Sequence, residues 1–143
     1  MIRIEGTEIN PSEHEAEAAS SSYLMSLVVV LVGIPLPVIN LIATIMFFIG
    51  NRKKTLFVRW HSMQALLSQL FLFFMNSYGF WWTIAIIFTS KEITNNYIAY
   101  ILTIFMVNVV ELVATIYAAL ETRKARHVRM PIFAEFTDQI IKR

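Results

Sequence analysis

The sequence contains no cysteine, and this absence removes several classes of function at once. Without thiols, the chain can form no disulfide framework, no thiolate metal site and no cysteine nucleophile. Its four glycines are scattered, so there is no glycine-rich loop that could hold a phosphate. It also lacks a histidine–glutamate metalloprotease box and a Gly-x-Ser-x-Gly nucleophile elbow. We therefore expect a protein that is not an enzyme and that uses no cofactor.

Histidine is also too sparse to indicate a metal site. His14, His61 and His127 lie on distant segments, and we find no histidine or carboxylate partner at ligand spacing within any one segment. The basic residues flank long apolar stretches, where membrane topology accounts for them. Neither a metal nor nucleic acid is therefore an expected partner.

Charge is missing from three long stretches, residues 21–51, 62–90 and 93–110. A helix needs about 20 mostly apolar residues to cross a hydrocarbon core of about 30 Å. The sequence therefore predicts an all-α integral membrane bundle of three transmembrane helices, at about 24–50, 57–88 and 97–120. Pro35 and Pro37 fall inside the first span and predict a kink or break there.

Three regions follow from this pattern: an acidic tail at 1–22, a transmembrane domain at 23–120 and a basic tail at 121–143. The loop after the first span and the C-terminal tail are both rich in lysine and arginine, whereas the second loop is neutral. Lysine and arginine concentrate on the cytoplasmic side of membrane proteins. We therefore expect the N-terminus outside and the C-terminus in the cytoplasm, in a bacterial inner membrane.

Glu111 is an acidic residue within the third expected span, where an unpaired carboxylate would be costly. Counting from the cytoplasmic ends places Asn40 and Gln69 at a similar depth, and Asn108 shares the helical face of Glu111. These four residues could form one intramembrane polar cluster. One interpretation is a clasp that holds the helices together, and the other is a carboxylate that handles protons or a substrate.

A second polar group opens the second span. Arg59 and Trp60 stand where a helix would meet lipid headgroups, and His61 and Gln64 share a helical face. The pattern fits interfacial anchoring, and a polar seam toward the third span or a partner subunit is the alternative.

The motif Arg-aromatic-His-x-x-Gln-Ala-Leu-Leu, which begins at Arg59, resembles that of a widespread family of small bacterial membrane proteins of unknown function. That family is itself similar to the membrane subunit of the chloroplast inner-envelope protein-import translocon. The resemblance covers roughly residues 24–132 and maps onto Arg59, His61, Gln64 and Ala65, with Trp60 where Phe or Tyr is expected. It implies a fold and a membrane location rather than an activity.

The C-terminal tail predicts a short amphipathic helix after Pro131. Its apolar side chains are Ile132, Phe133, Phe136 and Ile140. Because basic residues precede it, we expect this helix to lie on the cytoplasmic leaflet, with docking onto a partner protein as the alternative.

Two functional hypotheses follow from the sequence. In the first, the chain is a small accessory or structural subunit of a larger inner-membrane complex, such as one for protein translocation or insertion. In the second, it is a homo-oligomeric channel or transporter that uses Glu111. The expected partners are the lipid bilayer and either other integral membrane proteins or further copies of the chain.

Overall fold

The computed structural model describes residues 3–5, 11–33, 37–90 and 92–141. The side chains of residues 3–5, 28–33, 37, 39 and 40 lie outside that description. In chain order the elements are β1 (Arg3–Glu5), α1 (Glu13–Gly33), α2 (Pro37–Asn51), α3 (Leu56–Thr89), α4 (Asn95–Arg123), β2 (His127–Arg129) and α5 (Phe133–Ile140). Apart from one pair of three-residue strands, every regular element among the described residues is a helix, so the prediction of an all-α protein is confirmed.

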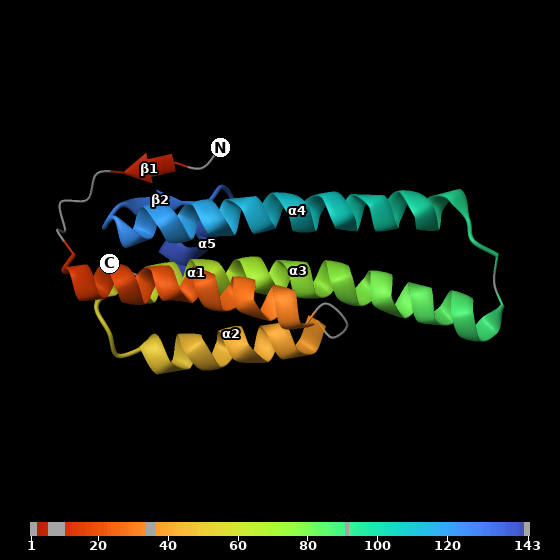
Figure 1. Cartoon of the computed structure of the whole chain (residues 1–143), viewed down its shortest axis with the longest axis horizontal. Coiled ribbons are helices and arrows are strands. Elements are labelled where there is room, and N and C mark those ends of the chain that lie inside the picture. Colours follow the sequence, from red (N-terminus) through yellow and green to blue (C-terminus); the bar gives the residue numbers. More distant parts are fainter. Residues whose placement is uncertain (1–2, 6–10, 34–36, 91, 142–143) are drawn as a thin grey trace.

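The prediction of three transmembrane helices is wrong for the described residues, in which two helices, α3 and α4, are long and apolar enough to cross a membrane. With 34 and 29 residues, they extend about 51 and 43 Å at 1.5 Å per residue. They form a long antiparallel pair, joined by the short loop between Thr89 and Asn95 (Figure 1).

The expected first span is instead two helices that pack against each other and against α3 (Figure 1). The stretch 34–36, with Pro35, lies outside the described residues, but α1 ends at Gly33 and α2 begins at Pro37. The 15 residues of α2 extend only about 22 Å, which is short of the hydrocarbon core. The expected first span is therefore two antiparallel helices rather than one kinked helix.

Residues 13–22, which the sequence analysis assigned to the acidic tail, form the first half of α1. A capping box starts this helix: the Ser12 amide donates to the Glu15 carboxylate at 2.7 Å, and the Glu15 amide donates to the Ser12 hydroxyl at 3.3 Å. The hydrogen bond from the Ser12 backbone favours the ionised carboxylate, and this lowers the pKa of Glu15 below its usual value.

A segment near the N-terminus and a segment near the C-terminus meet in the strand pair. β1 pairs antiparallel with β2, with Ile4 opposite Val128. Residues 3–5 and 127–129 therefore lie side by side. This pairing does not fit the expectation that the termini occupy opposite sides of the membrane, whereas two crossings, by α3 and α4, would return the C-terminus to the side of the N-terminus.

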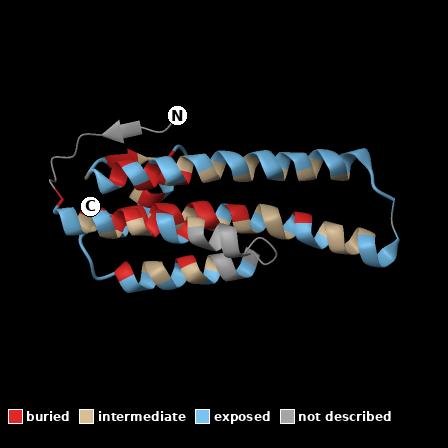
Figure 2. Cartoon of the chain, viewed as in Figure 1, coloured by how far each residue is buried: buried red, intermediate tan, exposed pale blue. Residues whose placement is uncertain are grey.

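Burial is concentrated at the same end of the helices. The buried residues of α1, α3 and α4 gather where β2 and α5 lie, whereas the distal halves of α3 and α4 are mostly exposed or half-buried (Figure 2). Large apolar side chains remain exposed along those distal halves, among them Phe74, Trp81, Phe88, Leu102 and Phe105. This distribution is typical of a surface that faces lipid rather than water. The molecule thus combines a packed end with a two-helix extension.

Candidate functional site

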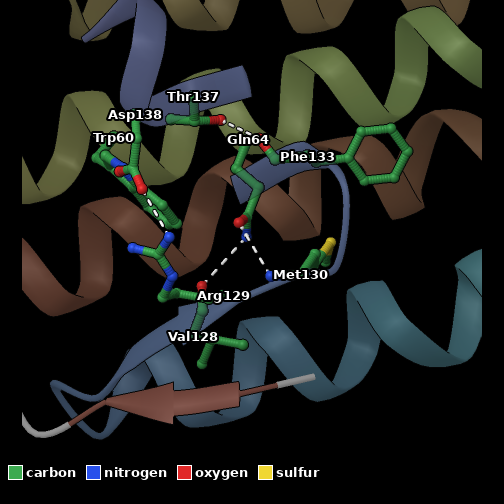
Figure 3. A network of polar contacts seen from close by, with 8 residues as sticks. All are labelled: Trp60, Gln64, Val128, Arg129, Met130, Phe133, Thr137 and Asp138. Atoms are coloured by element: carbon green, nitrogen blue, oxygen red, sulfur yellow. Dashed lines mark hydrogen bonds and ion pairs between the residues drawn. The ribbon is translucent and has the colours of Figure 1, made fainter. Parts of the chain in front are cut away.

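The packed end contains a continuous buried polar network, centred on Gln64 in α3 and connecting α1, α3 and β2. The Gln64 side chain is fully buried. It points toward β2 and the residue after it, where the Met130 amide donates to Oε1 of Gln64 at 3.0 Å (Figure 3). From the same side chain, Nε2 donates to the Val128 carbonyl at 3.2 Å and to the Tyr23 hydroxyl at 2.8 Å.

These contacts fix the direction of the hydrogen bonds that follow. The Met130 amide is a donor and the Val128 carbonyl an acceptor, so the orientation of the Gln64 amide is determined by its surroundings. Tyr23 accepts from Gln64, and its own proton therefore goes to Nδ1 of His61 at 2.8 Å. Neutral His61 then carries its proton on Nε2, which donates to Nδ1 of His127 at 3.2 Å. The hydrogen bonds therefore run in one direction, from the Met130 amide through the buried side chains of Gln64, Tyr23 and His61 to His127.

A second set of contacts holds α5 against the start of α3. The Trp60 indole donates to Oδ1 of Asp138 at 2.7 Å, and Arg129 pairs with Oδ2 of the same carboxylate at 2.6 Å (Figure 3). The Arg129 guanidinium also lies 5.8 Å from the centroid of the Trp60 ring, within range of a cation–π contact. Asp138, on α5, thus links Arg129 of β2 to Trp60 of α3.

We call this whole arrangement the C-terminal clamp: Tyr23, Trp60, His61 and Gln64, with the segment 127–138 that they hold. Sequence reasoning identified three of these four side chains but placed them differently. Trp60 was expected at the lipid headgroups, and the structure buries it under the C-terminal segment. Arg59, the remaining residue of that motif, is exposed.

Sequence reasoning missed Tyr23, Arg129 and Asp138 and considered His127 only as a metal ligand. Arg129 and Asp138 pair across nine positions, but the partners of these residues on α3 lie 38 to 78 positions away along the chain, so no local spacing indicates those contacts. The one available signal was Asp138, an acidic residue on a short helix otherwise rich in apolar residues. Such a carboxylate needs a donor, but the sequence does not say which one.

The expected intramembrane cluster consisted of Asn40, Gln69, Asn108 and Glu111, and the structure places Asn108 and Glu111 in separate contacts. The hydroxyl of Ser68 donates to the Glu111 carboxylate, and that of Thr115 does so at 3.2 Å. Asn108 makes a reciprocal amide pair with Asn76, at 2.8 and 3.1 Å. Gln69 is buried nearby in α3, and the Asn40 side chain lies outside the described residues. Glu111 and Asn108 therefore each join α4 to α3, at successive levels of the helix pair.

The expected amphipathic helix is α5 with the residue before it. Ile132, Phe136 and Ile140 are exposed, whereas Phe133 is half-buried, with its ring centroid 5.9 Å from that of Phe71 in α3. Metal binding gains no support from this end of the molecule: among the described residues, no group of three histidine, cysteine or acidic side chains is placed to hold an ion.

Fold and site together define a small helical membrane protein whose C-terminal segment is fastened to its membrane helices by buried hydrogen bonds. Residues 18–137 match the model of the magnetosome magnetite crystal formation protein family, and the chain belongs to that family. The matched region begins within α1 and ends within α5, so it contains nearly the whole clamp. No curated protein and no solved structure matches the chain.

The family corrects the functional hypotheses drawn from the sequence. The resemblance to a family of small membrane proteins was right, but the similarity to the chloroplast import translocon gains no support. A role in protein translocation or insertion, and the alternative of a channel or transporter, are both overturned, because the family is one of magnetite crystal formation.

Proposed function

We propose that this protein is a non-enzymatic membrane component of magnetite crystal formation, embedded in the membrane that encloses the growing crystal. The observation that carries the proposal is the family match over residues 18–137. Two long apolar helices and a lipid-facing distal half support the membrane location. The clamp supports a structural role, since its polar groups are directed toward one another inside the protein.

We further propose that the clamp lies on the cytoplasmic side. Every lysine and arginine among the described residues belongs to the end of the molecule that carries the clamp: Arg3, Arg52, Lys53, Lys54, Arg59, Arg123, Lys124, Arg126 and Arg129. The positive-inside rule counts lysine and arginine, and acidic residues contribute little to it. The glutamates near the N-terminus therefore do not oppose this orientation, which leaves the loop around Glu92 to face the crystal compartment or the periplasm.

Cysteine labelling tests this orientation directly, because the native chain contains no thiol. Exposed residues at the two ends offer matched sites, Lys53→Cys at the clamp end and Glu92→Cys in the distal loop. In isolated, sealed crystal-containing vesicles, whose outer face is the cytoplasmic one, an impermeant maleimide should label Lys53→Cys alone. Glu92→Cys should react only after detergent opens the vesicles. Labelling in the reverse order would contradict the proposed orientation.

Crystal growth tests the function. In a magnetite-forming bacterium that lacks its own family member, expression of this chain should restore the size of the magnetite crystals, measured by electron microscopy. Because the proposed role is structural, Glu92→Gln, which removes the carboxylate from the distal loop, should restore the crystals equally well. Unchanged crystals in cells that contain the protein at normal levels would refute the proposed function.

A further inference from the structure

The apolar side of α5 is exposed, although the rest of the packed end is well covered. Ile132, Phe136 and Ile140 are 66%, 53% and 55% exposed, and they are large side chains at four-residue spacing. A soluble surface rarely presents such a row without a partner. We propose that this row docks into the headgroup region of the same bilayer that α3 and α4 cross, and that anionic lipids favour the docking.

The helix has three distinct sides, and their order around the axis supports a lipid partner. At about 100° per residue, Ala134 and Thr137 share the side that is buried against the protein, and Ile141, the residue after the helix, is buried as well. The exposed polar residues Glu135 and Gln139 lie on a second side. The apolar row occupies the third. A helix in a membrane surface needs this division, with one side toward water and one toward acyl chains.

The apolar side is also continuous with the lipid-facing surface of the membrane helices. Phe133, which borders the row, contacts Phe71. Within α3, Phe71 is the first large apolar side chain that is exposed, and those before it are buried or half-buried. On α4 the exposed apolar residues end at Leu120, shortly before Arg123. The row on α5 therefore meets the edge of the surface that already faces lipid.

Charge around α5 complements an anionic leaflet. Three exposed basic residues stand here: Arg123, the last residue of α4, and Lys124 and Arg126, which lie between α4 and β2. Lys124 and Arg126 pair with Glu121, but their side chains remain 60% and 56% exposed and can still meet headgroup phosphates. Juxtamembrane clusters of this kind are attracted to anionic lipids.

Backbone strain at the start of α5 indicates that the surrounding contacts hold this helix in its orientation. Ile132 adopts φ 71° and ψ −60°, and the Phe133 amide donates to the Pro131 carbonyl at 2.9 Å across it. This is a γ-turn with positive φ, an unfavourable conformation for a β-branched residue. The turn directs Ile132 outward and Phe133 toward Phe71, and such strain persists only where the surrounding contacts hold it.

The test uses the full chain in lipid nanodiscs, labelled at one introduced cysteine with an environment-sensitive fluorophore. Phe136→Cys places the label in the apolar row, and Glu135→Cys, one residue away, is the matched control on the polar side. Both residues are exposed, so neither change alters a packed core. Lipids with a quencher near the top of the acyl chain should quench the label at position 136 several-fold more than the label at 135. Quenching at 136 should increase when phosphatidylglycerol replaces phosphatidylcholine, and Arg123→Gln with Arg126→Gln should reverse that increase.

Two results would overturn the inference. Equal, weak quenching at both positions would show that the row faces water or awaits a protein partner, because the purified nanodisc contains no other protein. Stronger quenching at 136 that is the same in both lipids would refute the role of anionic headgroups. Neither result depends on magnetite, so failure here is distinguishable from failure of the proposed function.

Discussion

Replacing Gln64 with methionine should release the C-terminal segment and lower the free energy of unfolding by about 3 kcal/mol. Methionine has a similar length and shape, but it can make none of the three hydrogen bonds of the glutamine. The change leaves the Met130 amide and the Val128 carbonyl without their side-chain partner in a buried place, and each unsatisfied group costs about 1–3 kcal/mol. Partial relaxation keeps the total below the sum of those costs.

Thermal unfolding of the detergent-solubilised chain measures the loss of stability, and limited trypsin cleavage measures the release. In the variant, cleavage at Arg126 and Arg129 should become faster, because Arg126 borders the segment that Gln64 holds and Arg129 lies within it. Gln139→Met is the control, since Gln139 is an exposed glutamine of α5. If both variants unfold at the same temperature and are cleaved at the same rate, Gln64 does not anchor the segment.

Such a result would also connect the clamp to function. The same Gln64→Met protein should fail to restore crystal size under conditions in which Gln139→Met succeeds. A stable, correctly located Gln64→Met protein that restores normal crystals would show that the clamp serves stability alone.

The helical content and two of the three predicted spans were accessible from sequence, because an uncharged run of sufficient length has few alternatives to a helix in lipid. The hairpin of α1 and α2 was not accessible. Two prolines indicate a break in a helix but not the direction of the chain after it. Here the direction depends on packing of α1 against α3 and α4, and on strands of three residues that no local pattern marks.

The expectation that the termini lie on opposite sides of the membrane has a specific physical origin. The glutamates near the N-terminus were read as evidence for an outside location, although acidic residues influence orientation only weakly. When only lysine and arginine are counted, each of the two segments that meet in the strand pair carries a positive residue. The sequence was therefore compatible with two crossings as well as three.

Trp60 shows why the site itself was only partly predictable. An indole suits a membrane interface and a buried hydrogen bond equally well, because it combines a large apolar ring with one donor. Only the presence of Asp138 at 2.7 Å decides between these roles. That contact joins positions 78 residues apart, so it depends on the assembled fold.

Leucine in place of Ala119 should separate α1 from α4 and lower the free energy of unfolding by about 3 kcal/mol, near the upper end of the usual cost of overpacking. The two helices approach closely where Ala119 is buried, and the Ser20 hydroxyl donates to the Ala119 carbonyl at 2.8 Å. The neighbouring Ala118 and, on α1, Ala19 are completely buried. Small residues permit this approach, and three additional carbon atoms have no space to occupy.

Ala99→Leu provides a matched control, because Ala99 is an exposed alanine of the same helix and lies in the distal, lipid-facing half of the molecule. Thermal unfolding should therefore separate the two variants, with Ala99→Leu close to the native chain. Amide exchange should locate the damage: α1 should lose protection in Ala119→Leu, whereas the distal part of the α3–α4 pair, which α1 does not cover, should keep it. Equal stability of the two variants would contradict the close packing of α1 on α4. Because the hydroxyl of Tyr23 enters the clamp from α1, loss of this packing should also weaken the hold on the C-terminal segment.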